Sequence, residues 1–210
     1  MIKNKGGLEM IEKKSSENES CCSGNSGCCT PEQTIPTEKR RINIDFLYLD
    51  LSVCAPCQGA ESILDEAIKD VANILELTGV EVLVNKVNVT NEEQAMNFKF
   101  VSSPTIRING RDIQFEVKES SCQTCSDLSG EATDCRIWVY QGKEHNVPPK
   151  AMIIEAILKE VYGGNGGDNA VVQDYVMPEN LKQFYSAMER KKQETGSPCC
   201  GASSSNGCCQ

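Results

Sequence analysis

The sequence predicts an α/β fold in which a mixed sheet is flanked by helices, with a disordered, cysteine-rich tail at each end. Apolar strand-like segments alternate with amphipathic helical segments over residues 41–162, which is typical of such a fold. An Asn109-Gly110 pair separates two strand-like runs and indicates a hairpin. Residues 1–40 and 196–210 are rich in Ser, Asn, Gly, Glu and Lys, a composition that cannot offset its own chain entropy.

The first half of the domain is predicted to alternate strand and helix. Residues 41–51 are apolar on both faces, as expected of a central strand. Residues 63–75 carry apolar side chains at helical spacing, and Gly79 ends this helix. Residues 80–89 supply the next strand, and a capping box at 90–93 opens a short helix. This order predicts two parallel strands joined by a helical crossover.

The second half is predicted to add a hairpin, a further strand and two helices. Residues 103–117 form two strand-like runs around the Asn-Gly pair, so the third and fourth strands are expected to be antiparallel. Residues 135–140 read as a strand and 149–161 as an apolar helix. A glycine-rich linker, 163–170, leads to a C-terminal helix within 171–195. We expect the apolar stripe of that helix to pack on the domain.

The charge of the chain argues against two classes of partner. The formal net charge is -9 at pH 7, whereas binding to nucleic acid or to an anionic membrane requires clustered Lys and Arg. The N-terminus lacks the apolar stretch of a secretory signal, and no segment approaches the ~20 apolar residues of a membrane span. We therefore expect a cytoplasmic protein without nucleic-acid or membrane partners.

The chain contains 13 cysteines, five in the predicted domain and eight in the tails. An odd count without an export signal favours reduced thiols that are kept for chemistry or for metal over a disulfide scaffold.

The best-defined cysteine motif is Cys54-Ala55-Pro56-Cys57, between the first strand and the first helix. A thiol at a helix N-terminus has its pKa lowered from about 8.5 into the ~3.5 to 7.5 range, because free backbone N–H groups and the helix dipole favour the thiolate. Cys54 is predicted to attack a disulfide as the exposed nucleophile. Cys57 would then resolve the mixed disulfide from within the helix.

This motif, its flanking strand and helix, and Ser103-Pro104-Thr105 at the start of the hairpin resemble the thioredoxin superfamily over residues 41–162. The resemblance implies that Pro104 is cis, faces the dithiol and shapes the substrate groove. A second group of residues is similar to a poorly characterised thioredoxin-like domain family of anaerobic prokaryotes, which implies a fold but no assigned activity. That group comprises Cys122, Cys125, Cys135, Trp138, Tyr140, Gly142, Pro148 and Pro149.

A second dithiol, Cys122-Gln123-Thr124-Cys125, is expected at the same end of the sheet as Cys54, because the fourth strand returns to the end at which the third begins. Cys135 should begin its strand nearby. Three interpretations remain open: an electron relay between dithiols, a shared soft-metal site, and a structural zinc held by these three cysteines and a fourth ligand.

His145 is the only histidine and completes an apparent C-x2-C-x9-C-x9-H pattern. From Cys135 to the turn at Gln141-Gly142, which precedes His145, the strand runs about six residues at ~3.3 Å each, and this is too far for a shared tetrahedral site. We therefore expect His145 to be a surface or packing residue.

The tails carry four pairs of adjacent cysteines. Adjacent Cα atoms are about 3.8 Å apart, less than the ~4.4 to 6.8 Å of a relaxed disulfide, whereas two adjacent thiolates can hold one soft ion. Thiolates select zinc, copper(I) and similar ions. The pairs are also similar to those of arsenical-resistance proteins and arsenic metallochaperones, which implies binding of arsenite. They are Cys21-Cys22, Cys28-Cys29, Cys199-Cys200 and Cys208-Cys209.

Two functional hypotheses follow. The first is a thioredoxin-like thiol-disulfide oxidoreductase that acts on a protein disulfide or thiol partner without a required cofactor, with Cys54, Cys57 and Pro104 at its site and Cys122, Cys125 and Cys135 as a relay. The second is a non-enzymatic protein that binds a thiophilic metal or metalloid, or a metallochaperone. It would take the ion from a donor through the tail pairs and pass it to the domain thiols.

Overall fold

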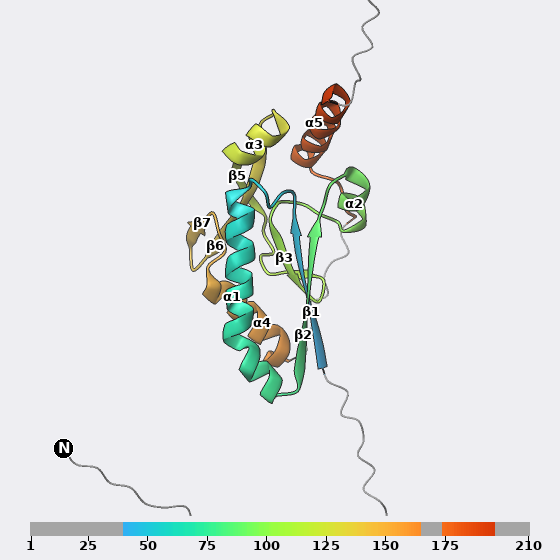
Figure 1. The fold of residues 1–210 in the computed structure, drawn as a ribbon. Helices are drawn as coiled ribbons and strands as arrows, with labels where there is room; N and C mark the ends of the chain where they lie inside the picture. Colours follow the sequence, from blue (N-terminus) through green and yellow to red (C-terminus); the bar gives the residue numbers. More distant parts are fainter. Residues whose placement is uncertain (1–39, 165–173, 196–210) are drawn as a thin grey trace, which may run out of the picture. The chain divides into compact units, whose positions relative to one another are not determined.

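The computed structural model describes residues 40–164 and 174–195, which form two sheets and five helices (Figure 1). The mixed α/β architecture with flanking helices agrees with the prediction. The four adjacent cysteine pairs and residues 165–173 lie outside the described residues.

The main sheet has four strands in the order β2-β1-β3-β4. β1 is central: it pairs parallel with β2 and antiparallel with β3, with Ile44 opposite both Val84 and Ile108. The parallel pair needs the crossover that α1 provides. The strands are β1 (Arg40–Tyr48), β2 (Val80–Asn88), β3 (Thr105–Ile108) and β4 (Arg111–Asp112).

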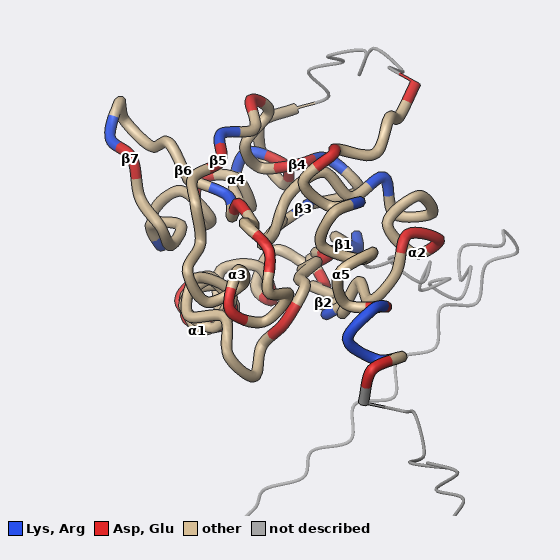
Figure 2. The backbone as a smooth tube through the Cα atoms, turned by 90° about the horizontal axis from the view of Figure 1, so that it is seen from above, with Lys and Arg blue, Asp and Glu red and all other residues tan. Residues whose placement is uncertain are grey.

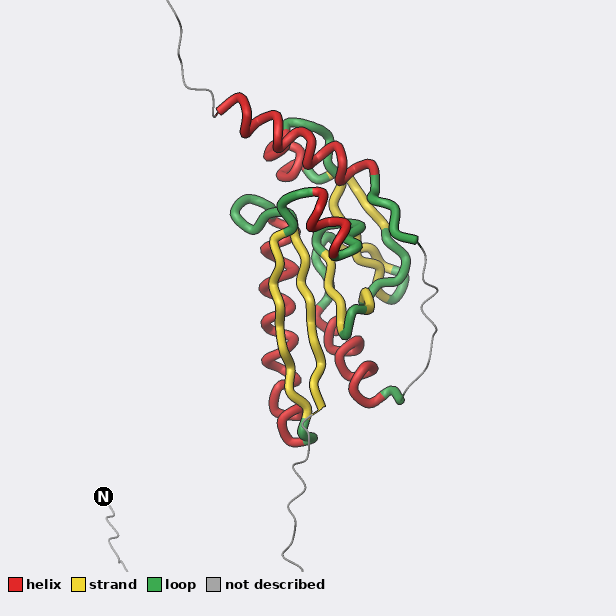
Figure 3. Tube along the Cα trace, turned by 90° about the vertical axis from the view of Figure 1, so that its right-hand side faces the viewer, coloured by secondary structure: helices red, strands yellow, loops and turns green. Residues whose placement is uncertain are grey.

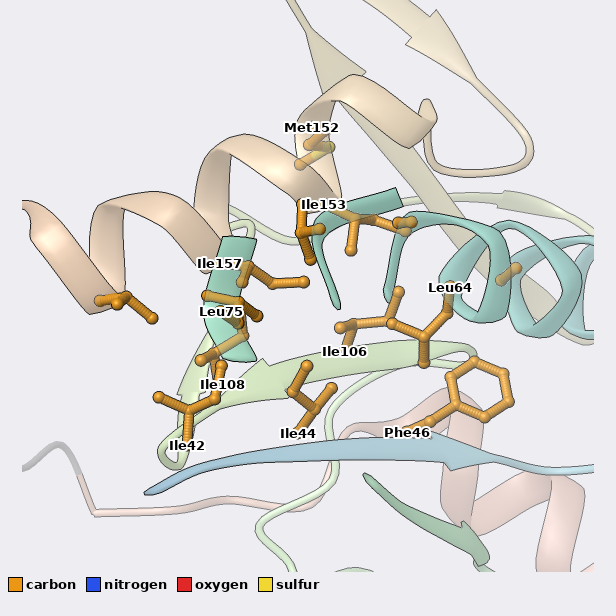
Figure 4. Packing of buried hydrophobic residues seen from close by; sticks show 14 of the residues in the cluster. Ile42, Ile44, Phe46, Leu64, Leu75, Ile106, Ile108, Met152, Ile153 and Ile157 are labelled. Carbon is orange, nitrogen blue, oxygen red and sulfur yellow. The ribbon is translucent and has the colours of Figure 1, made fainter. Parts of the chain in front are cut away.

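Two helices, α1 (Ala55–Leu77) and α4 (Lys150–Tyr162), cover one face of this sheet. Alternate residues of β1 face them, so Ile42, Ile44 and Phe46 are buried while Arg41 and Asn43 are exposed. Figure 4 shows these three residues packed with apolar side chains of β3, α1 and α4. The partners labelled there are Leu64, Leu75, Ile106, Ile108, Met152, Ile153 and Ile157.

A second apolar cluster lies at the C-terminal ends of β1 and β2 and joins α2 (Glu92–Asn97) to α5 (Glu179–Thr195). Leu47 and Phe100 pack there with Leu181 and other residues of α5, and the Tyr185 hydroxyl donates to the Val89 carbonyl at 3.2 Å. The C-terminal helix therefore packs on the domain, as Figure 3 also shows.

The second sheet is antiparallel, with the order β5-β6-β7. The predicted hairpin of the main sheet is shorter than expected, because β4 has only two residues and 113–116 form bends instead of a long fourth strand. The buried Gln114 side chain donates to the Glu116 and Ile137 carbonyls and accepts from the Val139 N–H, so a side chain replaces the missing ladder. The elements are β5 (Lys118–Ser121), α3 (Gln123–Ser129), β6 (Asp134–Tyr140) and β7 (Lys143–His145).

Arg136 of β6 ties this second sheet to the first. Its backbone N–H donates to the Ser103 carbonyl at 2.8 Å. Its fully buried guanidinium pairs with both carboxylate oxygens of Asp112, at 2.7 and 2.8 Å, and lies 5.2 Å from the Trp138 ring centroid. The bidentate pair fixes β6 beside β4, and the backbone bond fixes it beside the start of β3.

Charged residues of both signs are distributed over the described elements, and the longest basic run lies in α5 (Figure 2). None of the described helices has the length and apolar character needed to cross a membrane.

Candidate metal centre

Both C-x-x-C motifs occupy equivalent positions at the starts of two helices. Cys54 is the N-cap of α1 and Cys122 the N-cap of α3, so Cys57 and Cys125 each fall on the third helical residue. Neither N-cap side chain makes a capping hydrogen bond, and neither first turn contains an acidic residue. In the 23-residue α1, the positive end of the helix dipole therefore faces sulfur.

The loop before Cys54 is held by side chains that accept from its backbone. One Asp50 carboxylate oxygen accepts from the N–H groups of Ser52 and Val53, at 2.7 and 2.8 Å. The Ser103 hydroxyl accepts from the Leu49 N–H at 3.1 Å. These bonds fix the direction in which the chain enters α1.

The domain cysteines come together in one buried cluster. The Cys54 sulfur lies 3.0 Å from that of Cys57 and 3.6 Å from that of Cys125, which in turn is 3.3 Å from that of Cys135. The sulfurs of four cysteines, Cys54, Cys122, Cys125 and Cys135, all lie within 4.8 Å of one another. A tetrahedral ion with ~2.3 Å bonds to sulfur needs sulfurs about 3.8 Å apart, so the donor set fits a four-thiolate site after small shifts.

His145 is not part of this set. It lies in β7 opposite Trp138 and is half-buried. The fourth sulfur beside Cys122, Cys125 and Cys135 is that of Cys54, a grouping that corresponds to the shared soft-metal site among the three interpretations left open by the sequence. The sequence signal for this role was the predicted placement of both dithiols at one end of the sheet.

The cluster is enclosed. Cys54, Cys57 and Cys125 have no exposed surface, while Cys135 is 4% and Cys122 is 6% exposed. All five are free thiols. This differs from the expected exposed nucleophile at Cys54, because the segment from β5 to β6 brings Cys122, Cys125 and Cys135 against it. A partner's disulfide cannot reach the Cys54 sulfur in this conformation.

The thiols have unequal acidities because they share hydrogen bonds. Hydrogen bonds from Cys125, and then from Cys135 and Cys57, hold the pKa of Cys54 far below its usual value. The pKa of Cys57 is raised by the hydrogen bond between Cys57 and Cys54 and by the burial of the Cys57 thiol. Hydrogen bonds to Cys125 and Cys54 likewise raise the pKa of Cys135. In the metal-free cluster, negative charge is therefore favoured at Cys54 and disfavoured at Cys57 and Cys135.

Cys57 stands apart from the four-sulfur set. It contacts Cys54 on one side and the Ser103 hydroxyl, at 3.3 Å, on the other. The sequence analysis did not single out Ser103, although it precedes Pro104 in the recognised motif. The peptide bond between these two residues is cis, as the resemblance implies, and the serine hydroxyl joins this loop to the dithiol.

A cavity of about 250 Å³ adjoins the cluster. Its wall is built from the start of α1, the end of β5, the start of α3 and part of β6. A larger hollow of about 600 Å³ lies over the open face of the main sheet, lined by Asn43, Asp45, Asn85 and neighbouring residues without any cysteine. The smaller cavity is therefore the one that bears on the thiols.

Comparisons with known proteins give one family and no close relative. No curated protein and no solved structure matches the chain. A family model described as a domain of unknown function (DUF2703) matches residues 42–157, more than half of the chain, and this span contains Cys54, Cys57, Cys122, Cys125 and Cys135. The chain thus belongs to the DUF2703 family, and its five domain cysteines lie within the family's own domain.

Proposed function

We propose that this domain binds a single thiophilic metal or metalloid ion through Cys54, Cys122, Cys125 and Cys135. The observation that carries the proposal is the set of four buried sulfurs within 4.8 Å of one another. Thiolates select zinc, copper(I) and similarly soft ions over magnesium or calcium, which prefer oxygen ligands. Trivalent arsenic has the same preference for sulfur.

The surroundings of the cluster support a charged thiolate site. Cys54 already carries the most acidic thiol, at the N-terminus of the long helix α1. Each further thiol would release its proton as it takes up the ion, because only the thiolate is a ligand. The burial of all four sulfurs removes water that would compete for the ion.

The thioredoxin-like character of the domain forms part of the proposal. It is supported by the order of β1, α1 and β2, the C-x-x-C motif at the start of α1, and a cis proline that follows a serine in contact with Cys57. In this interpretation the segment from β5 to β6 adds three cysteines to a dithiol fold and turns it into a binding site.

Native mass spectrometry tests this proposal. The full chain with its eight tail cysteines changed to serine is reduced and presented with zinc, copper(I) or arsenite. We expect one ion per chain, lost or greatly weakened in Cys54→Ser, Cys122→Ser, Cys125→Ser and Cys135→Ser. Cys57→Ser is the matched control, because this buried thiol lies outside the four-sulfur set, and it should retain the ion. Absence of binding with all three ions, or equal loss in Cys57→Ser, contradicts the proposal.

A second candidate function, thiol-disulfide exchange, is favoured by the 3.0 Å contact between the Cys54 and Cys57 sulfurs. An external disulfide would take two electrons from this dithiol, giving the Cys54–Cys57 disulfide and two external thiols. An oxidoreductase loses turnover in Cys54→Ser and keeps it when the tail cysteines are replaced. Unchanged turnover in Cys54→Ser would rule this function out.

The adjacent cysteine pairs of the tails suggest a carrier role that extends the first proposal. A carrier would collect the ion on these pairs and transfer it to the domain. Replacing Cys21, Cys22, Cys199 and Cys200 with serine should then lower the number of ions bound by the full chain. A stoichiometry that stays the same would exclude these four residues as ligands.

A further inference from the structure

The four-cysteine centre is accessible from one side only. Cys122 and Cys135 line the cavity of about 250 Å³, whereas Cys54 and Cys125 do not. The exposed fractions follow the same division: 6% and 4% for the first two, and none for the second two. An ion that reaches the centre from this cavity therefore meets Cys122 or Cys135 first.

The side of the centre at Cys54 is closed by packed groups. Cys54 is backed by Cys57, which contacts the Ser103 hydroxyl. Tyr48 and Leu51 pack against the cluster as apolar cover. An ion arriving from this side would have to displace close-packed side chains.

Cys122 is the sulfur least engaged with other thiols. Its side chain contacts the Thr124 hydroxyl at 3.3 Å and shares a hydrogen bond with one thiol, Cys135, whereas Cys125 contacts both Cys54 and Cys135. With a single thiol partner, Cys122 can turn toward an incoming ion at the loss of one hydrogen bond, while the contacts among Cys54, Cys125 and Cys135 stay in place. Cys122 is thus the sulfur best placed for the first bond.

The cavity wall suits a neutral or bulky thiolate complex more than a bare ion. Its members beside the cysteines are mainly small or uncharged polar residues, including Ala55, Ser120, Ser121 and Asn146. The charged side chain that contributes, Arg136, is engaged by Asp112. No carboxylate of the described residues lines the cavity to attract a hydrated cation.

We infer that the ion enters and leaves the centre through this cavity, carried by an external thiolate, in a ligand exchange that begins at Cys122. The inference rests on the proposed metal site and adds its route and the class of its donor. In the first step a bond forms between the ion and the Cys122 sulfur while a bond between the ion and the donor sulfur breaks. The Cys122 proton passes to the departing thiolate, and no electrons are transferred.

Two sources can supply the same donor chemistry. One is a small soluble thiol such as glutathione, and the other is an adjacent cysteine pair of the tails, for example Cys199-Cys200, which lies a few residues beyond the end of α5 at Thr195. The cavity has to be open for either source, so its wall can be tested independently of the donor.

The test measures the rate of cadmium transfer from a cadmium–glutathione complex to the reduced full chain, by stopped-flow absorbance of the cadmium–thiolate band. Two variants fill the cavity, Ala55→Phe and Asn146→Phe, both at exposed wall positions. Ala151→Phe is the matched control, because Ala151 is also an exposed alanine in the first turn of a helix and does not line the cavity. A chain with all eight tail cysteines changed to serine is measured in parallel.

We expect each cavity variant to slow loading by about tenfold, the effect of overcrowding a packed site by a few methylene groups. Removal of cadmium by excess glutathione should slow by the same factor, because a blocked route changes the barrier in both directions and leaves affinity and stoichiometry unchanged. Ala151→Phe should behave as the original chain. Retained transfer in the tail variant identifies the small thiol as a sufficient donor, and its loss identifies the tails.

If both cavity variants bind cadmium and load it at the same rate as the unsubstituted chain, the inferred route is wrong, but the proposed metal site is not contradicted. Failure of the original chain to bind cadmium would instead overturn the metal site itself. Two independent wall positions guard against a single variant that does not fold.

Discussion

Formation of the Cys54–Cys57 disulfide is expected to release the metal ion, because Cys54 is common to the dithiol and to the four-sulfur set. The two sulfurs lie 3.0 Å apart, so a short approach forms the ~2.05 Å bond. The perturbation is oxidation of the loaded protein by hydrogen peroxide, a small oxidant that converts the dithiol into the disulfide and is itself reduced to water.

The size of the effect follows from the number of ligands. Four-ligand zinc sites bind with about 10 to 16 kcal/mol, or roughly 2.5 to 4 kcal/mol for each ligand. Loss of one of the four sulfurs should then weaken zinc binding by roughly 60- to 700-fold, at about 1.4 kcal/mol per factor of ten. The remaining sulfurs of Cys122, Cys125 and Cys135 would hold the ion only weakly.

The assay follows zinc release with a colorimetric chelator during oxidation, with the tail cysteines changed to serine, and identifies the disulfide by peptide mapping. Cys57→Ser is the control, because it keeps all four ligands and removes the partner for oxidation. It should retain zinc at least ten times longer, by the same conversion. Full zinc affinity in protein whose Cys54–Cys57 disulfide has been mapped would refute the shared role of Cys54.

Three further outcomes are expected. Ser103→Ala should destabilise the domain by about 1 to 3 kcal/mol in urea unfolding, because the buried Leu49 N–H loses its acceptor. Ser52→Ala, at an exposed position, serves as the control. Equal free energies of unfolding for Ser103→Ala and Ser52→Ala would show that the Ser103 bond contributes nothing. Arg136→Met should cost about 3 to 5 kcal/mol, because it leaves the Asp112 carboxylate without its buried partner, and Arg111→Met, at an exposed site, should cost far less. In the metal-free reduced protein, the lowered pKa of Cys54 means that its thiolate should persist well below pH ~8.5, while the raised pKa values of Cys57 and Cys135 keep those thiols protonated above it. Thiolate absorbance at pH 6 should therefore vanish in Cys54→Ser and remain in Cys57→Ser, and its presence in Cys54→Ser would contradict the assignment.

The order of strands and helices could be predicted from the sequence because hydrophobic periodicity and turn residues are local signals. Residues 41–51 were recognised as central, and β1 lies between β2 and β3. The early end of β4 was not recognised, because it depends on contacts of Gln114 with residues of β6 that are more than 20 positions away. A side chain that replaces a backbone ladder leaves no periodic signature.

The site was predicted in its location but not in its grouping. Strand direction alone indicated that the two C-x-x-C motifs lie at one end of the sheet. It could not indicate that the Cys125 sulfur contacts that of Cys54, 71 residues earlier, since this depends on how the segment from β5 to β6 folds over α1. The sequence also left open whether Cys54 acts in redox chemistry or as one ligand of a shared soft-metal site, because the C-x-x-C motif is compatible with both.

The helix α3 has only seven residues, well below the ~12 to 15 at which an isolated helix becomes even marginally stable in water. Its start is held by Cys122 and Cys125 in the thiol cluster, and its end by the Lys191 ammonium, which donates to the Leu128 carbonyl at 2.7 Å. Occupancy of the cluster by an ion would add a covalent-strength anchor at one of these two ends. The amide hydrogens of residues 125–130 should therefore exchange more slowly when the ion is bound. The stability of this short helix would then differ between the metal-free and the metal-bound protein, and a partner that binds α3 could distinguish the two forms.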